Sequence, residues 1–161
     1  MPTLQDNQIM FTQFEPMLKN RFIFEIDGIP GYIVKAATLP EIDFEDVTID
    51  YMNTKFKTLG KPTWNDITLT FYQPVVPSGA QAVMEWVRLA YESVTGRAGY
   101  SDFYKKDVTL QLVGPVGDIV QQWKLVGAFV KNANFQDVDW SSSEPLTITA
   151  VVRYDYAILE F

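Results

Sequence analysis

The chain has 161 residues, of which 47% are hydrophobic and 20% charged, and its formal net charge is −7. This length predicts one domain, residues 1–161, with enough apolar side chains for a core. The chain has neither Cys nor His, which excludes disulfides, thiolate nucleophiles and the commonest general base and transition-metal ligand. The acidic excess opposes tight nucleic-acid binding, because binding to phosphate depends on Lys and Arg. No apolar run approaches the length of a membrane span, and no signal peptide is apparent.

Residues 1–19 show no regular period, and we expect them to form a flexible N-terminal arm. The segment Arg21–Asp27 alternates apolar and polar side chains, which predicts a strand. A turn at residues 28–31 and a second strand over Tyr32–Leu39 follow. These two strands are expected to form a hairpin.

Two further strands, Asp46–Tyr51 and Asp66–Tyr72, flank a polar connection over residues 52–62. We expect a long hairpin loop there, because connections in hairpins normally span only about two to five residues. Long loops are usually either disordered or packed on another surface. Apolar side chains within this one favour a partner surface. The residues expected to contact a neighbouring subunit or ring are Met52, Asn53, Lys55, Phe56, Lys57, Leu59 and Lys61.

A helix is expected at about residues 79–94. Ser78 and Gln81 have the spacing of a capping box, in which each side chain satisfies a free backbone amide. Apolar residues then recur at helical spacing, and Gly96 is expected to end the helix.

Three strands are predicted after the helix, over Asp107–Val113, Ile119–Val130 and Leu146–Tyr156. Gly127 lies inside the second of these and suggests a bulge or bend. Residues 157–161 are expected to form a C-terminal tail. The fold class is therefore mainly β, an antiparallel β-sandwich or barrel with one flanking α-helix.

Catalytic motifs are absent from the sequence, so we expect no enzyme, no cofactor and no metal site. The carboxylates of Glu41, Asp43 and Glu45 would share one face of an extended segment, and glycoside hydrolysis needs a carboxylate pair. Charge runs of this kind are usually solvated surface, which is the interpretation we favour. Trp64 and Trp140 lie beside predicted loops and could form a sugar-binding platform, but we expect both at the rim of the core.

The order of several segments carries a resemblance. KAATLP at residues 35–40 is followed by YMNTK at 51–55, a basic stretch with Gly60, and WNDITLT at 64–70. One amphipathic helix and a closing β half complete the pattern. Over roughly residues 18–156 the chain resembles the tail tube proteins of contractile-tailed bacteriophages, which are related to Hcp-type tube proteins of contractile injection systems.

The resemblance implies a structural protein whose homo-hexameric rings stack into a hollow tube in the virion tail, assembled in the host cytoplasm. It implies contacts with sheath, baseplate and tail-terminator proteins and none with a membrane. A tape-measure protein and DNA would pass through the lumen without tight binding, because an acidic wall repels phosphate. The candidate lumen carboxylates are Glu25, Asp27, Glu41, Asp43, Glu45, Asp50 and Asp155.

Other interpretations stay open from the sequence. The tube could belong to a type VI-like or other contractile injection system instead of a phage. The acidity could serve only to keep the subunit soluble. In a different class, the chain could be a monomeric β-barrel module that binds a ligand through exposed aromatic residues.

Overall fold

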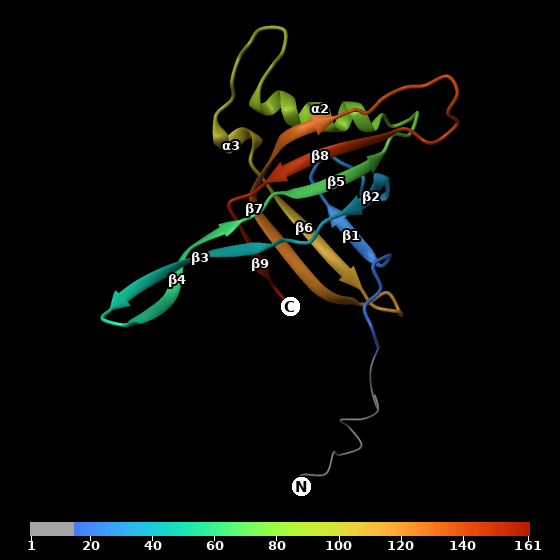
Figure 1. Ribbon diagram of the computed structural model, residues 1–161. Helices are drawn as coiled ribbons and strands as arrows, with labels where there is room; N and C mark the ends of the chain where they lie inside the picture. The colour runs from blue at the N-terminus through green and yellow to red at the C-terminus, as the bar shows by residue number, and fades with distance from the viewer. Residues whose placement is uncertain (1–14) are drawn as a thin grey trace.

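The computed structural model describes residues 15–161 and has the mainly β, antiparallel architecture that the sequence predicts (Figure 1). Residues 1–14 of the expected N-terminal arm lie outside the described residues, and residues 15–18 are neither helix nor strand. No helix within residues 15–161 is long and apolar enough to cross a membrane.

The first sheet contains β1 (Phe22–Glu25), β6 (Lys106–Val113), the first half of β7 (Ile119–Asn134) and β9 (Tyr156–Leu159). β6 lies between β1 and β7, and β9 pairs with β7 on its other side. All these pairs are antiparallel.

The second sheet contains β2 (Val34–Ala37), β5 (Ile67–Tyr72), β8 (Thr147–Arg153) and the second half of β7, in that order. Strand β7 therefore takes part in both sheets. It bends at Gly127, whose φ of 68° is left-handed, and the β6–β7 register shifts there, as expected for a bulge. A Cβ at Gly127 would collide with the Asp155 carboxylate, so the predicted bend is confirmed and requires glycine.

The core lies between the inward faces of the two sheets. The strands alternate as the sequence predicts, and in β5 every second side chain is buried. The largest fully buried side chains of the core are Phe24, Phe71, Ile67, Leu69, Leu110, Leu125, Ile148, Val83, Val108 and Val152. Trp64 packs against this core as expected, whereas Trp140 is fully exposed in the β7–β8 loop, so its predicted place at the core rim is wrong.

Helix α2 (Gly79–Ala90) buries Val83 and Trp86 against the core. It lies beside the short helix α3 (Ser101–Tyr104) (Figure 1). The Trp86 Nε1 donates a 2.8 Å hydrogen bond to the Tyr104 carbonyl of α3. The Ser78 Oγ accepts from the Gln81 amide as predicted. The Gln81 side chain donates to Glu85 instead, so only half of the capping box forms.

The helix ends four residues earlier than predicted. Tyr91 already has extended backbone angles and forms an isolated β-bridge with Ala98. Val94, the last apolar residue of the predicted stripe, is consequently exposed. Helical spacing in the sequence continued past the point where the chain turned back on itself.

Two further expectations are wrong. The predicted hairpin over residues 21–39 does not form, because β1 pairs with β6 and β2 with β5. A 3-10 turn at Gly31–Ile33 separates the two strands and sends them to different sheets. The predicted C-terminal tail is largely β9, because the long predicted strand breaks at residues 154–155 and continues along the first half of β7.

Candidate interaction site

The predicted loop over residues 52–62 is in fact a strand. Residues Thr54–Trp64 form β4, which pairs along its length with β3 (Ile42–Tyr51). Only Met52, with a φ of 48°, and Asn53 connect the two strands. Gly60 and Pro62 suggest a break in a strand, but proline is tolerated in edge strands and at bulges, and within residues 15–161 β4 pairs with β3 alone.

The β3–β4 hairpin is a continuation of the β2–β5 ladder beyond the body of the protein. At the junction, the Thr38 amide donates to the Thr68 carbonyl (3.2 Å) and the Asn65 amide donates to the Glu41 carbonyl (2.9 Å). From this root the two strands project away from the sheets (Figure 1). All of β3 is exposed, on both of its faces.

In the outer part of the hairpin, the register divides the side chains between two faces of different character. Directly opposed residues share a face, and successive residues along a strand alternate between faces. One face contains the opposed pairs Val47–Thr58, Ile49–Phe56 and Tyr51–Thr54. We call the side chains of Val47, Ile49, Tyr51 and Phe56 the apolar hairpin face. Their exposed fractions run from 44% for Val47 to 69% for Tyr51.

The opposite face carries Asp46, Asp50, Lys55 and Lys57. The Lys57 Nζ and the Asp46 Oδ2 are 3.8 Å apart, and both side chains are largely exposed. An exposed pair of this kind contributes little to stability. This ion pair therefore does little to hold the hairpin in place.

Gly60 marks a register shift between the inner and outer parts of the hairpin. A Cβ at this glycine would lie 2.9 Å from the Glu45 carbonyl oxygen and 3.3 Å from a Val47 methyl. The glycine is thus required by close approach of the β3 backbone. The same contacts place Glu45 on the side of Val47, at the inner end of the apolar hairpin face.

The root of the hairpin is held by polar contacts. Asp66 accepts hydrogen bonds from the Lys131 Nζ and from the Arg153 Nη1, each at 3.0 Å. The hydrogen bond from Lys131 is the main reason that the pKa of Asp66 lies below its ordinary value, against the opposing effect of burial. The Asn65 Nδ2 donates to the Asp43 Oδ2 at 2.6 Å. These contacts fix the direction in which the hairpin leaves the body.

The predicted contact residues occupy different parts of the hairpin. Met52 and Asn53 form its tip, and Met52 is 89% exposed. Phe56 lies on the apolar hairpin face, whereas Lys55, Lys57 and Leu59 lie on the opposite face. Lys61 lies within the register shift. The contact residues predicted from the sequence do not include Val47, Ile49 and Tyr51 of the apolar hairpin face, although the alternation of these residues along β3 could have revealed that face.

The candidate lumen carboxylates are distributed over several elements of the subunit. Glu25 lies on β1 and Asp27 in the turn that follows it, whereas Glu41, Asp43, Glu45 and Asp50 lie in or beside β3. Asp155 lies at the bend opposite Gly127 and is paired with the Lys105 Nζ at 3.0 Å. All seven are exposed in the isolated subunit.

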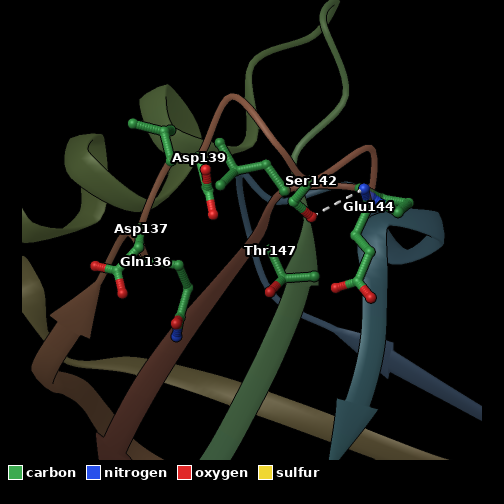
Figure 2. A pocket seen from close by; sticks show the side chains of 9 residues that line it. Gln136, Asp137, Asp139, Ser142, Glu144 and Thr147 are labelled. Atoms are coloured by element: carbon green, nitrogen blue, oxygen red, sulfur yellow. Dashed lines mark hydrogen bonds between the residues drawn. The ribbon is translucent and has the colours of Figure 1, made fainter.

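An open hollow of about 490 Å³ lies in the β7–β8 loop (Figure 2). Asp137, Asp139 and Glu144 are among its lining residues. The Ser141 amide donates to Asp139 at 3.0 Å and lowers the pKa of that carboxyl. Within residues 15–161, no group of three or more His, Cys, Asp or Glu side chains could hold a metal ion. Among these carboxylates, that of Asp139 organises a turn of the loop.

Comparison with known proteins gives matches in sequence and in structure, although no family model matches the chain. The tail tube protein gp19 of Enterobacteria phage T4 is 24% identical over 127 residues, which cover 76% of this chain and 77% of gp19. The gp19 protein of Enterobacteria phage T6 is 25% identical over the same length.

Solved structures with a similar fold include parts of injection systems. A chain from the tube-terminating cap of the anti-feeding prophage superimposes with a TM-score of 0.76 at 20% identity, covering 94% of this chain and 95% of the other. A chain from the extended sheath–tube complex of the PVC extracellular contractile injection system gives 0.72 at 18% identity, covering 98% and 99%. The chain is therefore a homologue of the tail tube protein gp19 of phages T4 and T6, with the fold found in tube and terminator assemblies of contractile injection systems.

Proposed function

We propose that this protein is the subunit of a hollow tail tube, in which homo-hexameric rings stack on one another. The homology to gp19 supports the tube, and one feature of the subunit carries the self-assembly. The β3–β4 hairpin protrudes from the body with both faces exposed and has no strand partner other than itself within residues 15–161. Exposed apolar surface and free strand edges of this kind normally mark an interface.

The hairpin reaches an adjacent subunit or ring. Burial of its apolar side chains there would contribute about 25 cal/mol for each Å² of apolar surface removed from water. The predicted contact residues Met52, Asn53, Lys55, Phe56, Lys57, Leu59 and Lys61 all belong to this element. Phe56 lies on the apolar hairpin face, whereas Lys55, Lys57 and Leu59 lie on the opposite face, so the apolar hairpin face supplies most of the apolar burial in this contact.

The tube conducts DNA and a tape-measure protein during ejection and is enclosed by a sheath. Similar folds occur in a sheath–tube complex and in a baseplate structure, which supports sheath, baseplate and terminator proteins as partners. The site of action is the virion tail, assembled in the host cytoplasm, or the equivalent tube of another contractile injection system.

The channel wall carries net negative charge from some of the candidate carboxylates. Asp155 contributes least, because Lys105 neutralises it. Tubes with Glu25→Lys and Asp50→Lys should retain DNA at low salt, where attraction to phosphate is least screened. Ejection or DNA release at the wild-type rate from such tubes would refute an electrostatic role for these two residues.

Electron microscopy of the purified protein tests the proposal. Wild-type protein should form rings or tubes at high concentration or with its baseplate partners. The matched variant replaces residues 45–61 by Asn-Gly, which closes the Phe44–Pro62 pair with a two-residue turn. It should keep the fold of the body but form no stacks. Wild-type protein that stays monomeric under all these conditions would exclude the tube and favour a monomeric ligand-binding module.

A terminator ring is the second candidate, favoured by the similarity to the chain from the tube-terminating cap. A terminator would form single rings that bind the end of an existing tube and do not grow. Length distributions in the same micrographs separate the two roles, because a tube subunit grows into stacks whereas a terminator does not.

A further inference from the structure

An apolar groove lies between the two sheets where they stay open. It is lined by β1 and β6 on one side and by β2 with the residues after it on the other, and its volume is about 480 Å³. β1 and β2 are the end strands of the sheet order, so each has a free edge toward this opening within the described chain. The apolar lining consists of Phe22, Ala36, Ala37, Leu39, Leu110 and Leu112.

The charged residues that line the groove are both lysines, Lys19 and Lys35. Neither belongs to an ion pair among residues 15–161. Lys35 lies over the ring of Tyr72 at 5.5 Å from its centroid, and this contact leaves its positive charge without a carboxylate. The groove is therefore apolar at its base and positive at its rim.

The apolar hairpin face has the complementary properties. Its outer part presents Val47, Ile49, Tyr51 and Phe56, and the charged residue on the same side is Glu45. The lysines of the outer strand, Lys55 and Lys57, lie on the opposite face. Docking of this face into the groove would thus bring its apolar side chains against the apolar lining of the groove. It would also bring the Glu45 carboxylate close to Lys19 and Lys35.

The two surfaces cannot meet within one copy. The groove extends along β2 to Leu39, close to the root of the hairpin, whereas the apolar hairpin face lies near the tip of an element that projects away from the body (Figure 1). A contact between them must join different copies. Because the two patches are different, the contact is heterologous, and repeated contacts of this type give closed rings or open stacks.

We infer that the groove between β1, β6 and β2 is the receptor for the apolar hairpin face of a second copy of this chain. The inference rests on the proposed self-assembly and specifies which surface of the neighbour takes the hairpin. Glu45 pairs with Lys19 or Lys35 at the rim, and Phe56 enters the apolar part of the groove.

Cysteine cross-linking tests this pairing without background, because the natural chain has no Cys. Copies with Phe56→Cys are mixed with differently sized tagged copies with Ala36→Cys, assembled and oxidised. The cross-linked heterodimer should be the main product. The matched control is Lys57→Cys, one residue along the same strand but on the opposite face, which should give only traces. Each mixture is also imaged, so that assembly is scored separately from cross-linking.

The possible results separate the inference from the proposed function. Tubes in which Phe56→Cys and Lys57→Cys link equally to Ala36→Cys, or in which neither links, would overturn the groove as receptor and leave the tube intact. Tubes in which Phe56→Cys links mainly to itself would assign the hairpin to a symmetric contact instead. Absence of both assembly and cross-linking would overturn both proposals. Linkage of Ala36→Cys to Ile9→Cys in place of Phe56→Cys would assign the groove to residues 1–14.

A charge exchange gives an independent test. Lys35→Glu and Glu45→Lys should each weaken assembly, because each places like charges at the rim, and the double variant should restore it. Glu144→Lys, the same change of charge in the β7–β8 loop, is the control and should neither weaken assembly nor rescue Lys35→Glu. Failure of the double variant to recover would refute the assigned rim contact.

Discussion

Strands in the body and in the β3–β4 hairpin show the same alternation of apolar and polar residues, but the apolar residues are buried in the body and exposed in the hairpin. In β5 the apolar residues Ile67, Leu69 and Phe71 are at most 1% exposed, whereas in β3 the equivalent alternation leaves Val47 and Ile49 about half exposed. Each strand is paired along its length, β5 with β2 and β8 on its two sides and β3 with β4 on one side. The difference is that β5 has a second layer above it and β3 has none. We therefore expect another molecule to supply the covering layer that the alternating strand β3 lacks.

The largest contrast between the two regions should appear in stability. Phe71→Ala removes a fully buried ring and should lower the free energy of unfolding by about 3–5 kcal/mol. Phe56→Ala should change it by less than about 0.5 kcal/mol in the isolated subunit, because the ring is exposed. Denaturant unfolding at low protein concentration measures both. A large loss for Phe56→Ala would show that the hairpin packs on its own body.

In assembly, unlike in the stability of the isolated subunit, we expect a large effect from a change at Phe56. Phe56→Ser removes a side chain whose burial at an interface contributes about 1.5–3 kcal/mol, equivalent to a roughly 10- to 100-fold higher protein concentration for assembly. Lys57→Ser, on the opposite face, is the matched control. Light scattering over a concentration series gives both thresholds. Equal thresholds for the two variants would remove the distinction between the faces.

Substitutions at two glycines, Gly127 in the body and Gly60 in the hairpin, should separate the stability of the body from the shape of the hairpin. Gly127→Ala forces a side chain into a left-handed backbone against Asp155 and should destabilise the body by about 1–3 kcal/mol. Gly60→Ala meets the Glu45 carbonyl and should distort the hairpin alone. We expect Gly60→Ala to unfold like wild type yet to assemble poorly. Comparable loss of unfolding free energy for both variants would mean that hairpin and body fold as one unit.

The smallest effect is expected at the junction between the regions, at Asp66. Its pKa is lowered in the folded state, so its contribution to stability is present above its unfolded value of 3.8 and is lost as pH falls through the lowered folded value. Asp66→Asn should therefore be less stable than wild type at neutral pH, with a difference that shrinks below pH 3.8. Acid titration of the unfolding free energy measures this, and a difference independent of pH would exclude the ion pair as its source.

The core strands and the helix could be predicted from sequence because burial imposes a period on them. Ile67, Leu69 and Phe71 alternate, Val83 and Trp86 keep helical spacing, and Gly127 marks a bend. Each of these features depends on residues that are close together in the sequence.

The partners of the strands could not be predicted in the same way. Neither the pairing of β1 with β6 nor that of β9 with β7 leaves a local signal, because both depend on contacts distant in sequence. The hairpin was misjudged for another reason. Its second strand alternates lysines with Phe56 and is interrupted by Gly60 and Pro62, a composition typical of loops when no partner is considered.

The continuity of the hairpin with the β2–β5 ladder has a mechanical consequence. A pull on the hairpin tip runs along the strands into β5, which is hydrogen-bonded to β2 on one side and to β8 on the other. Such a load shears many hydrogen bonds at once instead of opening them one after another. The ladder with β8 extends over six residue pairs, from Ile67–Val152 to Tyr72–Thr147. A tube joined through these hairpins would resist tension through the β5–β8 ladder, whose alternate side chains are buried in the core of each subunit.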